Sequence, residues 1–494
     1  MEEVRLRFAP SPTGMLHIGG LRTALYNYLY AKKMGGKFIL RIEDTDRTRF
    51  VDGAIENLLE ALDWAGVTID EGVHLENGKI TSIGEYAPYI QSERFEIYKS
   101  YIDELLDSGY AYYCFCDKER LDTLRTAQKI QGKIPKYDGL CRGVPLEEAR
   151  ERAESGEEYV IRLKLPHDRE IKFHDLVRGN VVINTNDLDD QVLIKSDGFP
   201  TYHLAVVIDD HLMKISHIVR GEEWLPSTPK HIFLYEAFGW EKPEFVHLPT
   251  VLNPDKKKLS KRQGDVSVED FKRAGYLPEG LVNYLCLLGW SAEDNREIFS
   301  LKEIEKLFSF DRTSRTGGVF DVEKLKWVNQ HYIKQKSAKE LLGLIEPYLK
   351  EANLWDTERI SEEMDKILSL IDEVKEGAQV LSDFPDLMKF YLGTGEILEE
   401  EAIKEIQNGD FLKLKTAVEE VLSSEGEITE ELSKNLINKV KTITGIKGKA
   451  LFMPLRAAIS GELHGPDMSF ILKILGKEKV LERINRALAL TERE

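Results

Sequence analysis

Residues 7–20 read RFAPSPTGMLHIGG, between an apolar-alternating run at 4–8 and a helical pattern at 21–33. Pro10 and Pro12 exclude a helix there and favour an extended approach, while Gly14, Gly19 and Gly20 remove side-chain bulk. A second strand is expected at 37–42. A strand, a glycine-rich turn, a helix and a strand in this order predict a βαβ unit, whose ligands bind beyond the carboxyl ends of the strands.

The composition indicates a globular protein of several domains. The chain has 494 residues, of which 42% are hydrophobic and 31% charged, and its length suggests roughly three or four domains. The N-terminal MEEVRLRFAP lacks the apolar core of a signal peptide, and no apolar run approaches the ~18 residues of a membrane span. Only four cysteines occur, which favours a reducing, cytoplasmic compartment.

The charge balance argues only mildly against a polyanionic partner. The formal net charge is -18, but binding depends on where positive charge gathers. Two basic stretches stand out, NPDKKKLSKRQG at 253–264 and NKVKTITGIKGKALFMPLR at 438–456.

The middle of the chain changes character twice. Residues 110–190 hold three of the four cysteines and an uneven mix of short elements, which indicates an insertion. The β-branched runs at 192–196, 201–208 and 215–219 then predict buried strands of a resumed sheet, followed by a helix at Ser227-Thr228-Pro229. From about residue 325 onward, helical periodicity predicts an all-α part.

Two short elements carry the chemistry. A histidine in a glycine-rich turn that opens a helix can reach phosphate oxygens, which the helix N-terminus also attracts. The lysines of KLSKR at 258–262 can place ammonium charge on a leaving pyrophosphate. Taken alone, the first is more often an ordinary turn and the second an ordinary solvated surface loop.

Together, the two elements resemble the His-Ile-Gly-His and Lys-Met-Ser-Lys-Ser signatures of class I aminoacyl-tRNA synthetases. Gly20 stands where the last histidine would be, and Leu259 and Arg262 replace Met and Ser; both departures are familiar within the family. Seven blocks, in order, are similar to bacterial glutamyl-tRNA synthetases and span nearly the whole chain: RFAPSPTG at 7–14, RIEDTD at 41–46, SDGFPTYHLA at 196–205, RGEEWLPSTPKH at 220–231, KLSKRQG at 258–264, FDVEKLKWVN at 320–329 and GKALFMPLRAAISGELHGPD at 448–467.

The resemblance implies an α/β fold. It implies a Rossmann-type parallel-sheet catalytic domain with an inserted acceptor-binding domain, followed by an all-α anticodon-binding region. The expected boundaries are 1–109 and 191–250 for the catalytic halves, 110–190 for the insertion, 251–324 for a stem-contact region with the lysine loop, and 325–494 for the helical region.

The resemblance also implies the site. The expected reaction is activation of glutamate by ATP, with Mg²⁺, to glutamyl-adenylate and pyrophosphate, then transfer to the terminal ribose of tRNA. The substrate-binding residues implied are Arg7 on the side-chain carboxylate, Ala9, Ser11, Glu43 on the ammonium, Tyr202, and Arg220 on the α-carboxylate. The ATP-binding and catalytic residues implied are His17, Gly19, Gly20, Lys258 and Lys261, with Trp224 either near the adenosine or in the core.

A zinc site is one of two open interpretations of the cysteines. Cys114, Cys116 and Cys141 cluster in the insertion, and a closed structural site needs a fourth ligand. Zinc-binding relatives have Cys-x-His at the second pair, but Arg142-Gly143 follows Cys141 here. Tyr137 could substitute for the histidine; the alternative is a residual cluster without metal.

The expected partner is tRNA-Glu. The Ala-Pro-Ser-Pro-Thr-Gly motif at 9–14 favours glutamate over glutamine, and Gly377 stands where discriminating family members carry an arginine, which suggests that tRNA-Gln is also charged. Two rival classes are a tRNA-modifying paralogue, which would lack the helical C-terminal part, and a non-catalytic RNA-binding relative, which would lose Lys261 or the glycines. A monomer is expected, because no long apolar seam is apparent in the sequence.

Overall fold

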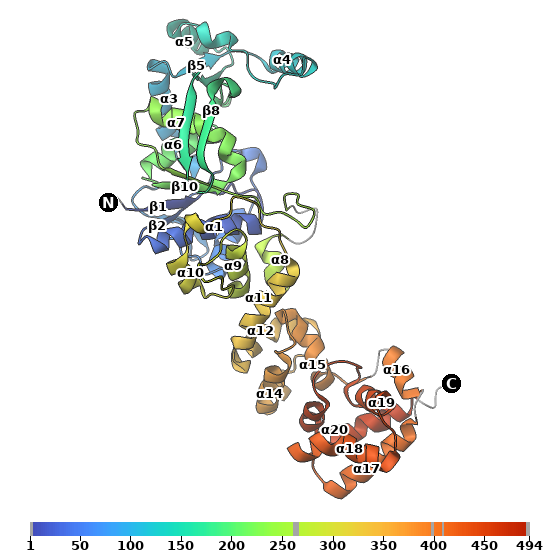
Figure 1. Ribbon diagram of the computed structural model, residues 1–494. Helices are drawn as coiled ribbons and strands as arrows, with labels where there is room; N and C mark the ends of the chain where they lie inside the picture. Colours follow the sequence, from blue (N-terminus) through green and yellow to red (C-terminus); the bar gives the residue numbers. More distant parts are fainter. Residues whose placement is uncertain (1–2, 260–265, 397–399, 408–409, 491–494) are drawn as a thin grey trace. The chain divides into compact units, whose positions relative to one another are not determined.

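The computed structural model describes residues 3–259, 266–396, 400–407 and 410–490, apart from the side chain of Arg47. They form two compact units, residues 1–272 with 281–322, and residues 273–280 with 323–494 (Figure 1). Within the described residues, no helix is long and apolar enough to cross a membrane.

The first unit is built on an eight-stranded sheet in the order β4-β3-β2-β1-β10-β11-β7-β8. Its inner neighbours are parallel, and β4 and β8 pair antiparallel at the two edges. The strands are β1 Arg5–Phe8, β2 Lys37–Leu40, β3 Glu71–Glu76, β4 Lys79–Ile83, β7 Glu170–Asp175, β8 Gly179–Asn184, β10 His217–Gly221 and β11 Glu244–Leu248.

The central crossover follows the expected βαβ pattern. Helix α1, Ile18–Lys33, connects β1 to β2 and buries Leu21, Leu25 and Leu29 against the sheet. β1 lies between β2 on one side and β10 on the other. The chain order therefore reverses at β1, where doubly wound sheets place their ligands.

One predicted strand is wrong. Residues 201–208 lie at the start of helix α6, Tyr202–Leu212, and seven consecutive residues from Leu204 to Asp210 are buried. A helix that is covered on all sides loses the polar stripe that reveals a 3.6-residue period. Its β-branched side chains then look like a buried strand.

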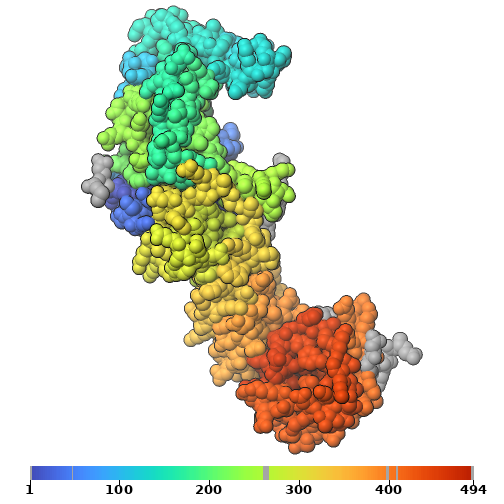
Figure 2. Space-filling view, in the orientation of Figure 1, coloured from blue at the N-terminus to red at the C-terminus, as the bar shows by residue number. Residues whose placement is uncertain are grey.

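The insertion also differs from the prediction in its connections. β7 and β8 fall inside residues 110–190 but extend the main sheet beyond β11. The strand predicted at 192–196 is β9, Val192–Ile194, and it belongs to a separate three-stranded sheet with β5, Ala111–Cys114, and β6, Val160–Leu163. The segment that includes α4, Lys118–Ile130, projects from the surface of this unit (Figure 2).

The remaining helices of the first unit pack on its two sheets or on other helices, as α5 does on β5 and α10 on α1. They are α2 Ala54–Trp64, α3 Phe95–Asp107, α5 Leu146–Glu154, α7 Thr228–Ala237 and α10 Leu301–Leu307. Along the sequence, the division between the two units falls within α8, Val268–Arg273, and within α9, Pro278–Leu287.

The second unit is helical, and no strand occurs among its described residues. Each helix buries an apolar face, such as Leu341, Ile345 and Leu349 of α12, whose first turn Ser337 and Glu340 close with a capping box. The helices are α11 Val322–Gln335, α12 Ala338–Glu351, α13 Thr357–Glu362, α14 Met364–Val374, α15 Phe384–Leu392, α16 Glu400–Gln407, α17 Phe411–Glu425, α18 Glu430–Thr444, α19 Lys449–Ser460 and α20 Met468–Leu488.

Candidate functional site

A cavity of about 760 Å³ opens at the carboxyl ends of β1 and β10. Its walls come from β1 and the loop after it, the segment after β2, the start of α6, and β10 with the turn after it. Seven of the predicted substrate and ATP residues line it: Arg7, Ala9, Ser11, Glu43, Tyr202, Arg220 and Trp224.

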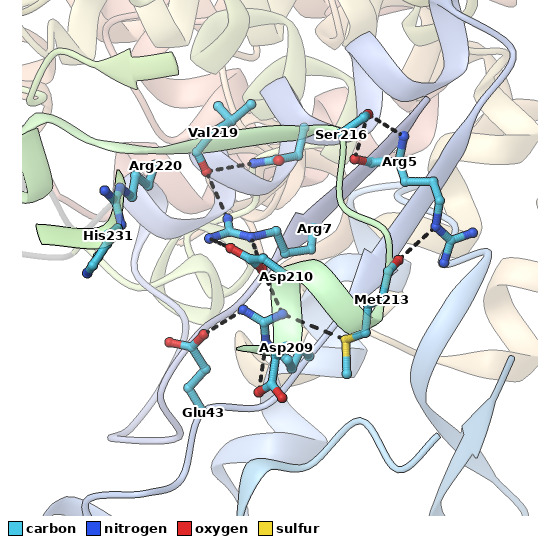
Figure 3. Close-up of polar contacts among 12 residues, drawn as sticks. Arg5, Arg7, Glu43, Asp209, Asp210, Met213, Ser216, Val219, Arg220 and His231 are labelled. Carbon is cyan, nitrogen blue, oxygen red and sulfur yellow. Dashed lines mark hydrogen bonds and ion pairs between the residues drawn. The ribbon is translucent and has the colours of Figure 1, made fainter. Parts of the chain in front are cut away.

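Arg7 enters the cavity from β1 with one side of its guanidinium already occupied. Its Nε and Nη2 donate to the two carboxylate oxygens of Asp210, at 2.9 and 3.2 Å, and both residues are buried. Nη1 makes only a long contact, 3.4 Å, with the Val219 carbonyl (Figure 3). These contacts use three of the five N–H groups of the guanidinium and leave one on Nη1 and one on Nη2 for a ligand.

Behind Arg7 lies a network of buried charges. Arg41 donates to Asp210 at 2.8 Å and to Glu43 at 2.9 Å, and Asp209 accepts from Arg94 at 2.7 Å. The buried network thus has as many guanidinium groups as carboxylates, and their formal charges cancel. Its members are Arg7, Arg41, Arg94, Glu43, Asp209 and Asp210. Such balance is what makes buried ionised groups tolerable.

Glu43 is the member of this network that faces the cavity. Its Oε1 is held by Arg41, while the carboxylate lines the cavity wall. Burial raises the pKa of Glu43, although Arg41 and Arg7 act in the opposite direction. A carboxylate in this position can accept hydrogen bonds from a bound ammonium group.

Arg220 is held by protein acceptors on every nitrogen. Nε donates to His247 at 3.1 Å, and Nη2 donates to Thr228 at 2.9 Å. Nη1 donates to the Tyr202 hydroxyl at 3.1 Å, and the Tyr202 ring packs against Trp224 with ring centroids 4.2 Å apart. Arg220 thereby fixes the aromatic wall of the cavity as well as its own charge.

The His17–Gly20 turn lies next to this cavity, at the start of α1. His17 caps the helix, and its Nδ1 accepts from the Gly19 backbone N–H at 2.9 Å. At Gly20, a Cβ would come within 2.9 Å of the Leu16 side chain, so a larger residue requires Leu16 to move. His17, Gly19 and Gly20 are not among the residues that line the cavity, but Thr23, in the next turn of α1, is.

Only part of the lysine loop, 258–259, lies among the residues that the structure describes. The Lys258 side chain is exposed, and its ammonium lies 3.6 Å from Glu223 of the cavity wall. Lys261 falls in residues 260–265, outside the described residues.

The predicted metal ligands lie together in the smaller sheet region. The Sγ atoms of Cys114, Cys116 and Cys141 are all within 4.8 Å of one another, and the Tyr137 hydroxyl lies 3.5 Å from the Sγ of Cys116. Burial alone would raise the pKa of Cys114, but hydrogen bonds from Tyr137, the Cys116 backbone and Arg162 outweigh it and lower that pKa. Cys286, by contrast, is fully buried, and its pKa is raised by burial to about 12.

Gly377 lies just after α14 in the second unit. An added Cβ would meet only the Val374 carbonyl at 3.6 Å and Leu387 at 4.0 Å, which are ordinary contacts. The position therefore accepts a side chain without rearrangement.

Sequence reasoning missed the residues that support the site. Asp209 and Asp210 lie outside the predicted site, yet both are fully buried partners of arginines. Arg41 and His247, also fully buried, were not singled out. Arg7 inside β1 and Arg41 directly after β2 are a usable signal, because buried cations require nearby acids.

Comparison with known proteins identifies the family. Residues 3–327 match the family model described as tRNA synthetases class I (E and Q), catalytic domain, and residues 340–488 match an anticodon binding domain. A glutamate–tRNA ligase of Finegoldia magna is 56% identical over 99% of this chain and 100% of that protein. The chain belongs to the glutamate–tRNA ligase family.

Other relatives agree along the whole length. The glutamate–tRNA ligase of Clostridioides difficile is 54% identical over 97% of this chain and 98% of that protein. A crystal structure of a glutamate tRNA ligase from Elizabethkingia meningosepticum in complex with its amino acid superposes with a TM-score of 0.88, at 41% identity and 99% coverage of each chain. Both domains of a class I synthetase are therefore present in this ATP-dependent ligase family member.

Proposed function

We propose that this protein joins glutamate to tRNA-Glu at the expense of ATP, through a glutamyl-adenylate. The observation that carries the assignment of the substrate is the cavity itself, where Arg7, Glu43 and the Arg220–Tyr202 pair converge from four segments: β1, the stretch after β2, β10 and α6. Together they match a molecule with two carboxylates and one ammonium group.

Arg7 receives the side-chain carboxylate of glutamate. Asp210 already occupies Nε and one N–H of Nη2, so the substrate is met by the remaining N–H groups of Nη1 and Nη2. A buried guanidinium favours a carboxylate over an amide, because only the charged acceptor compensates its desolvation. This contact selects glutamate over glutamine.

The other end of the amino acid is held by Glu43 and by the Arg220–Tyr202 pair. Glu43 takes the ammonium. Because the Tyr202 hydroxyl accepts from Arg220, its own hydrogen points elsewhere and can bond a ligand in the cavity. The Arg220 charge, next to this hydroxyl, favours the α-carboxylate.

ATP binds across the start of α1, with His17, Gly19 and Gly20 at its phosphates and Trp224 near the adenosine. The α-carboxylate attacks the α-phosphorus, and pyrophosphate leaves, assisted by Lys258 and Lys261. Mg²⁺ bound with ATP would supply charge neutralisation on the phosphates. The terminal ribose hydroxyl of tRNA then attacks the carbonyl carbon, and AMP leaves. No general base is needed for the first step, since positioning and electrostatics suffice for an ionised carboxylate.

A structural zinc fits the cysteine cluster. In a tetrahedral site with Zn–S distances of about 2.3 Å, sulfur atoms lie roughly 3.8 Å apart, and the Sγ atoms of Cys116 and Cys141 are 3.6 Å apart here. Tyr137 supplies the oxygen nearest to the fourth position. Such an ion would shape the inserted domain, 110–190, that we assign to the tRNA acceptor end.

The helical region binds the anticodon, and Gly377 leaves the choice between tRNA-Glu and tRNA-Gln relaxed. We further propose a cytoplasmic monomer with a stem-contact region at 251–324. The proposed catalytic halves at 1–109 and 191–250 gain β7 and β8 from the inserted stretch and lose β9 to the smaller sheet. The helices from α11 onward count against a tRNA-modifying paralogue, which lacks an anticodon domain.

The decisive experiment is aminoacylation with labelled glutamate, run in parallel on tRNA-Glu and tRNA-Gln transcripts. Charging of tRNA-Glu supports the main proposal, and charging of both supports relaxed discrimination. If neither transcript is charged while ATP–pyrophosphate exchange proceeds with glutamate, the activation chemistry stands and the acceptor assignment fails.

A further inference from the structure

A chain of buried polar side chains runs across three neighbouring strands to Arg220. Asp175 ends β7, His247 lies on β11, and Arg220 lies on β10 directly beside His247 in the strand register. All three are buried, with at most 5% of any of them exposed. We infer that Asp175 and His247 are positioning residues that orient Arg220, and through it Tyr202, for substrate binding; this inference rests on the proposed roles of Arg220 and Tyr202.

Asp175 is the fixed end of this series of hydrogen-bonded side chains. Its Oδ1 accepts backbone N–H groups of Val177 and Arg178 at 3.0 and 2.8 Å. Its Oδ2 accepts from the backbone N–H and from Nδ1 of His247, at 3.0 and 2.7 Å. Four donors on one ionised carboxylate leave it a single orientation.

This anchor selects the tautomer of His247. A carboxylate oxygen can only accept, so Nδ1 of His247 carries the hydrogen. The other ring nitrogen, Nε2, then has a lone pair that faces the Nε–H of Arg220 at 3.1 Å. The opposite tautomer would set two N–H donors against each other.

Thr228 closes the arrangement. Its Oγ1 lies 3.0 Å from His247 Nε2 and accepts from Arg220 Nη2 at 2.9 Å. Because Nε2 has one lone pair and Arg220 takes it, the Thr228 hydrogen goes to the Trp224 carbonyl at 3.2 Å. On the far side, Nη1 of Arg220 lies 3.2 Å from His231 Nδ1. The guanidinium is thus set by acceptors on three sides before substrate enters.

Two substitutions of His247 separate its hydrogen bond to Asp175 from its hydrogen bond to Arg220. In His247→Gln, the amide oxygen can reach the place of Nε2, so the acceptor for Arg220 is kept and the bond to Asp175 is lost. In His247→Asn, the shorter amide can satisfy Asp175 but cannot reach Arg220. His217→Gln is the matched control, because His217 lies on β10 but takes no part in the Asp175–His247–Arg220 hydrogen bonds. Its Nδ1 lies 2.8 Å from Ser216 Oγ.

The measurement is ATP–pyrophosphate exchange with glutamate, in the presence of tRNA, with KM for glutamate, KM for ATP and kcat taken separately. We expect His247→Asn and Asp175→Asn to raise the glutamate KM at least about tenfold, which corresponds to 1.4 kcal/mol. The ATP KM should stay within about twofold, with His247→Gln closer to the unmodified protein than His247→Asn. Equal KM values for glutamate in all variants, or parallel changes in both KM values, would overturn the positioning role.

A second measurement is made on the unmodified protein, and a variant serves only to assign its signals. In the unmodified protein with ¹⁵N-labelled histidine, the ring of His247, assigned by its absence in His247→Gln, should show the Nδ1–H tautomer. The Nε2–H tautomer would contradict the inference. If the unmodified protein forms no glutamyl-adenylate, the proposed function fails; if it does and the variants match it, only the positioning role fails.

Discussion

Asp210 of α6 binds Arg7 of β1 through both carboxylate oxygens, at 2.9 and 3.2 Å, and its Oδ1 also accepts from Arg41. One buried carboxylate thus fixes two buried guanidinium groups. The pKa of Asp210 is lowered because Arg7 and Arg41 outweigh the opposing effect of burial.

Asp210→Asn is therefore expected to be among the costly substitutions in the catalytic unit. It keeps the shape of the side chain but leaves two arginines with one fewer buried negative charge. Breaking a buried pair in this way typically costs about 3–5 kcal/mol. Thermal or urea unfolding of the variant should show the loss.

The control is Glu157→Gln, which removes an exposed pair with Arg152. Exposed pairs contribute about 0–1 kcal/mol. If both variants lose the same free energy of unfolding, the buried charges around Arg7 contribute no more to stability than an exposed ion pair.

Part of this fold follows directly from the sequence. The turn at 7–20 and the apolar runs beside it predict β1, α1 and β2, because prolines, glycines and periodicity are local signals. The helix α6 is the exception, since burial on every side removes its period. The placement of β7 and β8 in the main sheet is also non-local, because β7 pairs with β11 70 residues further along the sequence, Asp175 with Phe245, and such a pairing leaves no mark in either segment.

The site divides in the same way. Motifs identify the residues that line the cavity, such as Arg7, Glu43 and Arg220. They do not identify Asp210 or His247, whose importance comes from partners distant in the sequence.

Glu43→Gln should weaken recognition of the substrate's ammonium group. We expect the glutamate KM to rise by about tenfold or more, as for loss of a charge-assisted hydrogen bond. Glutarate, which has both carboxylates but no ammonium, serves as the control ligand. Its inhibition constant should change much less than the glutamate KM, and equal changes would assign Glu43 a general structural role instead.

The buried histidines predict a loss of stability in acid. Burial lowers the pKa of His203, to about 3, and burial also lowers the pKa values of His231 and His247. In the unfolded chain these groups bind protons near pH 6.5. The unfolded state therefore gains protons that the folded state refuses, and the free energy of unfolding falls as pH drops below about 6.5.

Free energies of unfolding, measured from pH 8 to pH 5, test this. His203→Gln should reduce the fall in the free energy of unfolding below pH 6.5 by up to about 1.4 kcal/mol per pH unit. His167→Gln, at an exposed position, should leave the dependence of the free energy of unfolding on pH unchanged. The same slope in both variants and in the unmodified protein would show that the buried histidines are not the cause.

The cysteine cluster predicts zinc in the purified protein. Elemental analysis should find about one zinc per chain, and Cys116→Ser should reduce it. Cys286→Ser is the control, because Cys286 is buried away from the cluster, with its thiol pKa raised to about 12. No zinc in protein purified without chelators, even after incubation with Zn²⁺, would favour the residual cysteine cluster.

Gly377 offers the sharpest test of tRNA choice. Its backbone is not in the left-handed region and its surroundings accept a Cβ, so Gly377→Arg should fold normally. An added guanidinium there can discriminate by contact or by repulsion at the anticodon. We expect tRNA-Gln charging to fall at least about tenfold relative to tRNA-Glu charging, which is 1.4 kcal/mol of differential binding.

Gly343→Arg is the matched control, since Gly343 is an exposed glycine of α12 and an added Cβ there would meet nothing within 4 Å. It adds the same charge to the same unit. An equal fall for both tRNAs, or the same change in the Gly343 variant, would mean that position 377 does not read the anticodon.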